Sequence, residues 1–445
     1  MGPETQDLVT GRLEASGTDP VSLTRISWLR EARFGLFIHW GLYSMPARHE
    51  WVKSRERLPD EHYNRYFEHF NPDLFNPAAW AEEASNAGMK YVVITTKHHE
   101  GFCLWDSALT DYKATNTPAG RDLLREIIEA FRRAGLRVGL YHSLIDWHHP
   151  EFPIDEFHPQ RDEPGARKER DMRKYSSYLH GQVRELLSSY GPIDYLFFDF
   201  SYPDRAYGGK GRDAWRSEDL LDLVRELQPT TIVNDRLDLP DADVRTPEQY
   251  QPVSPMSVRG VPVFWEACQT MNGSWGYDRD NLDWKPADLL VRMLIDGVSK
   301  GGNLLLNVGP TARGELEPRA VSLLRSIGVW THPHGRAIYG TGPSQLEPPS
   351  DCRYTQRGDK LYLSVFAWPF RHLHLPGLAD RVDYAQMLHD GSEVPMSVID
   401  SGQAAQNTTM GALDPGTLTL EMPIRRPEVL VPVIELFLRP ETASI

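Results

Sequence analysis

Short apolar segments and amphipathic segments alternate from about residue 34 to residue 330. The apolar segments have the length of β-strands, and the others carry apolar residues at helical spacing. Strands are predicted at 34–41, 91–99, 137–143, 194–200, 230–236, 261–268 and 303–310, and helices at 76–87, 122–134, 171–190, 217–227, 286–300 and 317–330. This alternation predicts a helix-covered parallel sheet and favours a closed (β/α)8-like barrel with one irregular unit. Because no Gly-rich loop follows the first strand, a doubly wound nucleotide-binding fold is disfavoured.

The pattern changes after Gly340, which divides the chain into regions. Residues 341–350 are rich in Pro and Ser and are expected to form a linker. Residues 351–445 contain short alternating strands without a helical pattern, so we expect a C-terminal antiparallel β-sandwich. Residues 1–20 are polar and are expected to form a disordered or loosely packed tail, which leaves 21–340 for the barrel.

The charge balance and hydropathy bound the possible partners. Lys and Arg number 48 against 62 Asp and Glu, which gives a net charge of −14 and argues against nucleic acid or an anionic membrane as a partner. No apolar stretch of about 18 residues is present, so no membrane span is expected. The N-terminus lacks a basic segment followed by an apolar run, and a cytoplasmic location is therefore expected. The oligomeric state is not predicted.

Polar side chains stand where several predicted strands end. The clearest case is Asp199, which follows the apolar run 195–198. A carboxylate there is costly unless it caps a loop, pairs with an arginine or takes part in chemistry. The other predicted strand ends carry His39-Trp40, His98-His99, Tyr141-His142, Asn234-Asp235-Arg236 and Trp265-Glu266. Since function in such barrels lies at the C-terminal ends of the strands, these residues predict one site.

Histidines with carboxylates are compatible with either a metal site or a sugar site. The histidines come as adjacent pairs, and neighbours on a strand point to opposite faces, so both members of a pair rarely bind one ion. Imidazoles and carboxylates equally hold sugar hydroxyl groups while two carboxylates cleave the glycosidic bond. We therefore expect a sugar site without a metal or an organic cofactor.

Several long motifs, ordered along the chain, resemble those of the α-L-fucosidases of glycoside hydrolase family 29. They are 33–44, 97–106, 198–199, 233–236, 265–277 and 302–310. The resemblance extends from residue 28 to residue 340, and the C-terminal sandwich also matches the family's layout. It implies a retaining exo-glycosidase that removes terminal α-L-fucose from oligosaccharides or glycoconjugates by double displacement. Two alternatives stay open: an exo-glycosidase for a related sugar such as an α-L-galactoside, and a fucose-binding protein with impaired catalysis.

The resemblance also implies roles for individual residues. Asp199 falls on the nucleophile of the family, and its His and Arg neighbours are expected to lower its pKa. Residues that hold the fucose or line its pocket fall on His39, Glu50, Trp51, His98, His99, Tyr141, Arg236 and Trp275. The chain departs from the family pattern at Phe197 and Phe200, where Trp and Gly are usual, and this difference is expected to affect the choice of leaving group.

The general acid/base is assigned to Glu248, with Glu266 as the alternative. Glu248 lies in the polar loop 246–250, from which a proton donor reaches the leaving-group oxygen more easily than from within a strand. Glu266 is then expected to bind the sugar or to orient Arg236.

Overall fold

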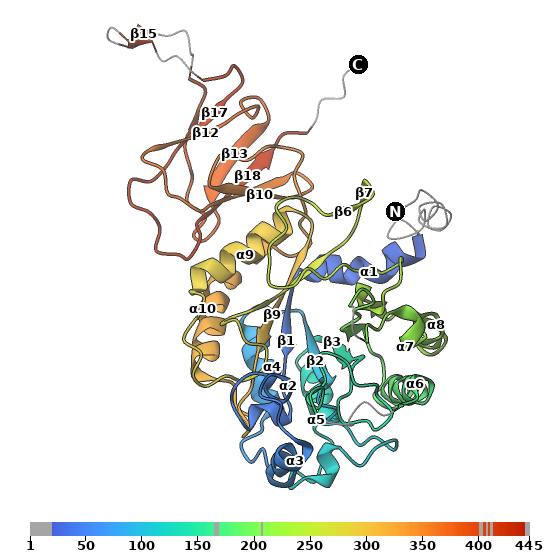
Figure 1. The fold of residues 1–445 in the computed structure, drawn as a ribbon. Helices are drawn as coiled ribbons and strands as arrows, with labels where there is room; N and C mark the ends of the chain where they lie inside the picture. Colours follow the sequence, from blue (N-terminus) through green and yellow to red (C-terminus); the bar gives the residue numbers. More distant parts are fainter. Residues whose placement is uncertain are drawn as a thin grey trace.

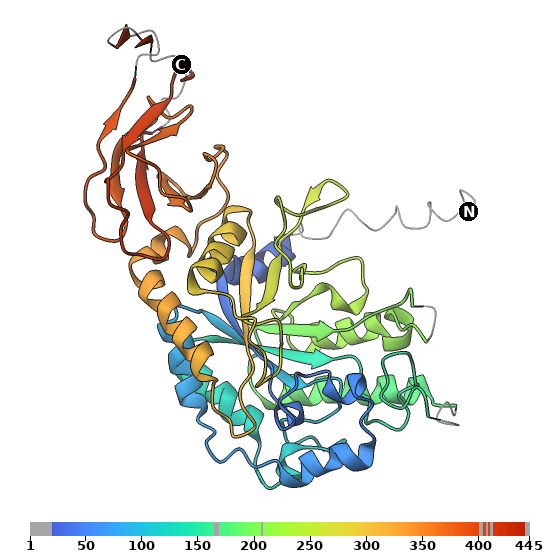
Figure 2. The same cartoon turned by 60° about the vertical axis from the view of Figure 1, so that its left-hand side comes forward.

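The computed structural model describes residues 20–163, 169–205, 208–399, 404–405, 408–409 and 413–440. A helix-covered sheet forms the larger part of the molecule, and a smaller all-β domain packs beside helices α9 and α10 (Figures 1 and 2). The tail predicted at the N-terminus lies outside the described residues as far as residue 19.

Seven parallel strands form the sheet of the large domain, in the order β5-β4-β3-β2-β1-β9-β8. They are β1 (Phe34–Ile38), β2 (Tyr91–Lys97), β3 (Arg137–Ser143), β4 (Tyr195–Asp199), β5 (Ile232–Val233), β8 (Glu266–Thr270) and β9 (Asn303–Val308). Most of these strands consist of buried residues, as expected for a parallel sheet covered on its outer face.

The segment 244–248 joins the two edges of this sheet. Val244 forms a parallel bridge with Asn234, while Arg245 and Glu248 form parallel bridges with Trp265 and Cys268. The backbone N–H of Glu266 donates to Arg245 O at 2.8 Å, and that of Cys268 donates to Pro247 O at 3.0 Å. The segment therefore occupies the eighth position between β5 and β8, and the predicted barrel with one irregular unit is confirmed.

Two of the predicted strands differ from those observed. Strand 230–236 is reduced to β5 because the Asn234 side chain, instead of the backbone, bonds both the N–H and the carbonyl of Phe198, at 2.9 Å each. Strand 261–268 is divided into the hairpin β6 (Ser257–Val258)–β7 (Val261–Pro262) and strand β8. Pro262 has no N–H with which to continue a ladder, so the chain bends before β8 begins.

The long helices surround the sheet, each with its apolar face inward. They are α1 (Pro20–Ala32), α4 (Pro77–Asn86), α5 (Leu123–Arg133), α6 (Met172–Ser189), α8 (Ser217–Leu227), α9 (Ala287–Ser299) and α10 (Pro318–His334). Capping side chains fix the starts of α4, α5 and α6: the Asp122 carboxylate, for example, accepts a hydrogen bond from Arg125 N at 2.9 Å. The other helices lie in the loops: α2 (Val52–Arg55), α3 (Asp60–His69), α7 (Arg212–Trp215) and the 3₁₀ turns η2 (Leu42–Ser44), η3 (Ala114–Asn116), η4 (Asp235–Leu237) and η5 (Gly335–Ala337).

The C-terminal domain consists of antiparallel sheets around its own core, as predicted. One sheet has the order β10 (Cys352–Arg357), β11 (Lys360–Val365), β18 (Val433–Leu438), β13 (Val382–Met387), and the other β12 (His372–Leu375), β17 (Leu418–Glu421), β14 (Met396–Ser397). A separate two-stranded sheet pairs β15 (Ala404–Ala405) with β16 (Thr408–Thr409). Leu363, Leu420 and Leu436 are fully buried within the domain.

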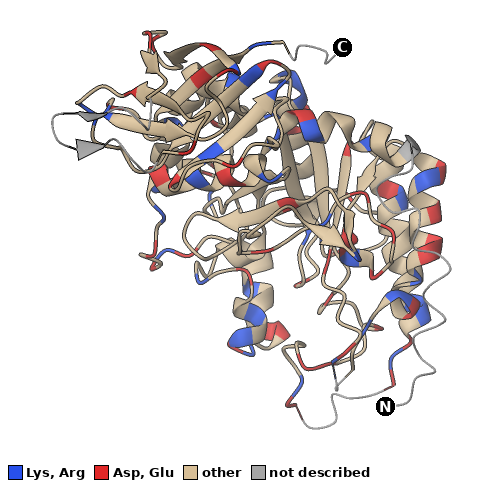
Figure 3. Ribbon diagram, turned by 90° about the horizontal axis from the view of Figure 1, so that it is seen from above, with Lys and Arg blue, Asp and Glu red and all other residues tan. Residues whose placement is uncertain are grey.

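The two domains are joined by polar contacts. Trp330 Nε1 of α10 donates to Val431 O at 2.7 Å, and Arg353 Nε lies 2.8 Å from Asp296 Oδ1 of α9. Gly342, in the segment between the domains, pairs with Gln356 of β10. Viewed from above, acidic and basic residues are interspersed on the helices and loops (Figure 3). Among the described residues, no helix has the length and apolar character that crossing a membrane requires.

Candidate active site

Alternate residues of the strands fill the barrel interior. On β4, Tyr195 and Phe197 belong to the cluster that also contains Phe37 of β1, Tyr141 of β3 and Leu305 of β9. Because side chains repeat every second residue along a strand, Asp199 points to the same side as Phe197. The nucleophile candidate therefore lies on the inner side of the barrel, at the C-terminal end of β4.

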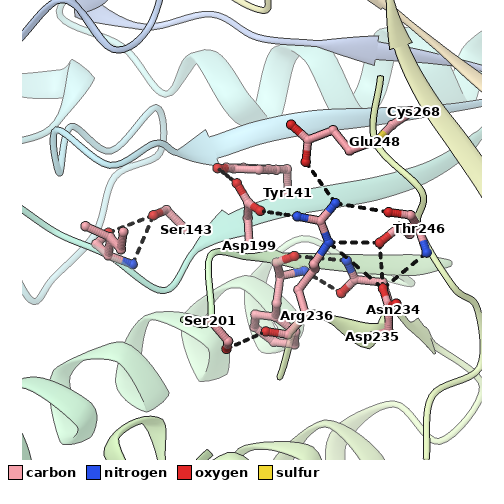
Figure 4. Close-up of polar contacts among 12 residues, drawn as sticks. Tyr141, Ser143, Asp199, Ser201, Asn234, Asp235, Arg236, Thr246, Glu248 and Cys268 are labelled. Carbon is pink, nitrogen blue, oxygen red and sulfur yellow. Dashed lines mark hydrogen bonds and ion pairs between the residues drawn. The ribbon is translucent and has the colours of Figure 1, made fainter. Parts of the chain in front are cut away.

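Three hydrogen-bond donors and one imidazole nitrogen surround the Asp199 carboxylate, and Figure 4 shows two of the donors, Tyr141 and Arg236. Tyr141 Oη donates to Oδ2 at 2.7 Å, and Arg236 Nη1 donates to Oδ1 at 3.1 Å. His99 Nε2 lies 3.9 Å from Oδ2, and the backbone N–H of Phe200 donates to the same carboxylate. These contacts fix the orientation of the carboxylate, as a nucleophile requires.

Phe200 has a left-handed backbone conformation, with a φ of 81°. This conformation is costly for a bulky residue, and it brings the Phe200 N–H toward Asp199. Ring contacts offset the cost, since the Phe200 ring centroid lies 5.2 Å from Trp51, 5.1 Å from His99 and 5.0 Å from Phe157. An aromatic cluster therefore occupies the space that the usual Gly would leave open.

Burial raises the pKa of Asp199 to about 6, although Arg236, Tyr141 and the Phe200 N–H oppose this shift. Arg236 therefore lowers this pKa as expected, but burial outweighs it, so the expected net decrease does not occur. The histidines contribute no positive charge, because burial lowers the pKa of His39 to about 3 and that of His98 and His99 well below the usual value. At neutral pH Asp199 is still largely ionised, and Arg236 is the cation that faces it.

Arg236 also contacts Glu248. Its Nη2 donates to Glu248 Oε2 at 2.9 Å, and its Nε donates to Thr246 Oγ1 at 3.0 Å (Figure 4). One guanidinium thus holds both carboxylates, a geometry compatible with the separation of roughly 5 Å that retaining glycosidases need. The Glu248 side chain is 40% exposed and that of Asp199 only 15%, so Glu248 lies on the solvent side of the pair.

Hydrogen bonds define the tautomer of His39. Asn307 Nδ2 donates to Trp275 O at 2.7 Å, which turns Asn307 Oδ1 toward His39 Nδ1, also at 2.7 Å. The proton of neutral His39 therefore lies on Nδ1, and Nε2 is free to accept a hydrogen bond.

The same logic applies to His99. Ser143 Oγ donates to Ile145 O at 2.8 Å and accepts from His99 Nδ1 at 2.7 Å. His99 Nε2, beside Asp199, is consequently an acceptor. Two imidazoles thus present acceptor nitrogens, which suits the recognition of sugar hydroxyl groups.

His98 has a different partner. Its Nδ1 lies 3.7 Å from Glu100 Oε2, and neither this nitrogen nor either Glu100 carboxyl oxygen has a hydrogen-bond partner in the described structure. Burial raises the pKa of Glu100 to about 8, so its carboxyl is mainly protonated at neutral pH. The His98 ring stacks on Tyr141 with 5.5 Å between centroids, which places it in the same site.

The remaining predicted pocket residues join this group. Glu50 Oε2 accepts the Gly276 N–H at 2.8 Å and so holds the loop that carries Trp275. The Trp275 ring lies 5.2 Å from His39, and the Trp51 ring lies 4.9 Å from His99. All of the predicted site residues except Glu266 therefore belong to one connected cluster.

Glu266 is the exception, because the prediction that Trp265-Glu266 ends a strand is wrong. Glu266 is the first residue of β8 and pairs with Asn303, the first residue of β9. It accepts a hydrogen bond from Tyr91, the first residue of β2, and is fully buried. It therefore lies at the N-terminal end of the barrel, and this position supports neither the acid/base alternative nor contact with the sugar or Arg236.

Sequence reasoning gave no role to four residues that support the site: Glu100, Ser143, Thr246 and Asn307. Glu100 and Asn307 lie within the motifs 97–106 and 302–310, and this position in the sequence could have indicated that they belong to the site. Ser143 and Thr246 are small polar residues whose partners only the tertiary structure reveals. In the described part of the chain, no three His, Cys, Asp or Glu side chains lie together so as to hold a metal ion.

A (β/α)8-like barrel with two carboxylates at the C-terminal ends of its strands, surrounded by imidazoles and aromatic rings, defines a glycoside hydrolase site. The family model described as Alpha-L-fucosidase matches residues 10–336. The tissue alpha-L-fucosidase of Mus musculus is 31% identical over 369 residues, which span 77% of this chain and 78% of that protein. The chain belongs to the α-L-fucosidase family, glycoside hydrolase family 29.

Solved structures agree with this assignment. The alpha-L-fucosidase isoenzyme 1 from Paenibacillus thiaminolyticus has a TM-score of 0.88 and 45% identity, and the match covers 94% of this chain and 100% of that one. A trapped covalent intermediate of the family 29 alpha-L-fucosidase from Bacteroides thetaiotaomicron, in complex with 2-fluoro-fucosyl fluoride, has a TM-score of 0.80 and 26% identity. That match covers 96% of this chain and 98% of the other. The family hydrolyses α-L-fucosides with retention of configuration.

Proposed function

We propose that this enzyme hydrolyses terminal α-L-fucosides with Asp199 as the nucleophile and Glu248 as the general acid/base. The observation that carries the proposal is Arg236, whose Nη1 and Nη2 bond the carboxylates of Asp199 and Glu248. Of the two carboxylates, Asp199 is the more buried and lies toward the barrel interior, and Glu248 is the more exposed and lies toward solvent. A retaining glycosidase needs its two carboxyl groups on either side of the scissile bond.

In the first step, the fucose ring lies against His39, His98, His99, Tyr141 and Trp275. Asp199 Oδ attacks the anomeric carbon, the glycosidic bond breaks, and protonated Glu248 gives its proton to the departing oxygen. The Tyr141 and Arg236 donors to Asp199 keep the attacking oxygen oriented. Neutral His39 and His99 accept hydrogen bonds from sugar hydroxyl groups through Nε2.

In the second step, ionised Glu248 takes a proton from water, and this water attacks the anomeric carbon of the fucosyl-enzyme. The bond to Asp199 breaks, and fucose leaves with its original configuration. The exposure of Glu248 supports this role, because its carboxylate is accessible to water.

Proton NMR of the hydrolysis of an aryl α-L-fucoside tests the proposal. α-Fucose should appear first, before mutarotation. Asp199→Gly should lower kcat by a factor of about 1,000 or more, and azide should restore turnover with β-fucosyl azide as the product. Near-normal activity of this variant would rule out Asp199 as the nucleophile.

A further inference from the structure

A cavity of about 620 Å³ adjoins Glu248 and Arg236. Its walls also include Arg245, Tyr250 and, from the β6–β7 hairpin, Arg259. Its volume is in the range of binding sites for small molecules. Asp199 does not line it. Glu248 therefore lies between the nucleophile, which faces the barrel interior, and this second space.

The charge of the cavity is opposite to that of the whole chain. Arg236, Arg245 and Arg259 line it with two carboxylates, Asp235 and Glu248, although the chain has a net charge of −14. Asp235 lies 4.0 Å from both Arg236 Nε and Arg245 Nη1, and Asp199 also pairs with Arg236. When Glu248 is protonated for bond cleavage, the cavity lining contains one negative carboxylate, Asp235, and three positive guanidinium groups.

Arg259 is the cation without a partner. Within the described residues it forms no ion pair or hydrogen bond, and it occupies a two-residue hairpin turn with Gly260. The φ angles of the two residues are 51° and 80°, a combination for which Asn-Gly or Gly-Gly is preferred. The turn itself therefore does not explain an arginine at this position, and its charge is available to a ligand.

Tyr250 gives the cavity an aromatic wall. It is 54% exposed and lies two residues after Glu248. An exposed aromatic ring offers a flat apolar surface on which the C–H face of a pyranose packs.

We propose that this cavity binds the sugar that leaves with the glycosidic oxygen, and that it favours a sugar carrying a carboxylate or a sulfate ester. The inference rests on the proposed role of Glu248 as proton donor. The leaving sugar packs on Tyr250, its glycosidic oxygen faces Glu248, and its anionic group faces Arg259. Arg259 is thus a specificity-determining residue.

The test uses three fucosyl disaccharides with one shared linkage, whose second sugar is galactose, galactose 6-sulfate or galacturonate. α-L-Fucosyl fluoride, which has no leaving sugar, is the reference substrate for each variant. Relative to the fluoride, kcat/KM of the native enzyme should favour at least one anionic disaccharide over the neutral one by about threefold to fivefold, the size expected for one exposed charge pair. The two anionic substrates distinguish a carboxylate from a sulfate preference.

Matched variants isolate the charge of Arg259. Arg259→Asn suits the turn and removes the charge, so the anionic preference should disappear, whereas Arg259→Lys should keep most of it. Tyr250→Ala should lower kcat/KM for all three disaccharides relative to the fluoride, and Tyr250→Phe should not. An equal rate on neutral and anionic disaccharides, or an anionic preference that survives in Arg259→Asn, overturns the proposal. Failure of the native enzyme to hydrolyse the fluoride would instead contradict the proposed function.

Discussion

Arg236 Nη2 donates to Glu248 Oε2 at 2.9 Å, and Nη1 of the same guanidinium donates to Asp199. The proposed acid/base and the proposed nucleophile therefore share one hydrogen-bond donor group. Glu266, the other acid/base candidate, lies at the opposite end of the barrel, where it contacts Tyr91. The two carboxylates can therefore be separated by experiment.

Glu248→Ala should lose at least about 100-fold on a fucosyl oligosaccharide, whose leaving oxygen needs a proton. It should retain far more of its glycosylation rate on a dinitrophenyl fucoside, and azide should give α-fucosyl azide. Glu266→Gln, the matched control, should leave the ratio of the two rates unchanged. If Glu266→Gln shows the leaving-group dependence and Glu248→Ala does not, the assignment to Glu248 is wrong.

The decrease in kcat/KM at low pH should reflect protonation of Asp199. Because the pKa of Asp199 is raised to about 6, kcat/KM should decrease as the pH falls below about 6. Tyr141→Phe removes a donor to the ionised carboxylate and should move the midpoint of this decrease up by about one pH unit. The measurement is kcat/KM for fucosyl fluoride between pH 4 and 8. A midpoint that does not move, or moves down, would show that Tyr141 does not stabilise ionised Asp199.

Asp199 should also reduce the stability of the fold. Its pKa in the folded state, about 6, is above the ordinary value of 3.8, so its ionised form is favoured in the unfolded chain. The stability associated with this group is complete below pH 3.8 and is lost as the pH rises to about 6. Asp199→Asn should therefore gain stability relative to the native enzyme between pH 4 and pH 6.5, by about 3 kcal/mol at most.

The measurement is the free energy of unfolding in denaturant of the native enzyme and of Asp199→Asn, each at pH 4 and pH 6.5. Because both proteins contain the same histidines, the contributions of the histidines cancel in the difference between the two proteins. A stability difference that stays constant or shrinks as the pH rises would contradict a raised pKa for Asp199.

The regular strands of the barrel were predictable because each contains a short, mainly apolar run. The eighth position was not, because the segment 244–248 contains only one large apolar residue, Val244, and is joined to the sheet by isolated bridges. Glu266 was misplaced because the apolar residues before it, 261–264, resemble a strand but belong to the hairpin and to the irregular segment that follows it.

The site residues were predictable from motifs, but their protonation states were not. The pKa of Asp199 depends on the balance between burial, which raises it, and Arg236, which lowers it, and the sequence does not reveal this balance. Likewise, the tautomer of His39 follows from Asn307, which is 268 residues away in the chain. The cytoplasmic location expected from the sequence stays a prediction.

The most direct measurement of the central claim is mass spectrometry of the enzyme after reaction with 2-fluoro-fucosyl fluoride. The fluorine slows both steps, and the good leaving group allows the first, so the fucosyl-enzyme accumulates. The native enzyme should gain the mass of one fluorofucosyl group, and proteolytic mapping should place it on the peptide that contains Asp199. An adduct on Glu248 or on any other residue, or no adduct in an enzyme that hydrolyses fucosides, would contradict Asp199 as the nucleophile.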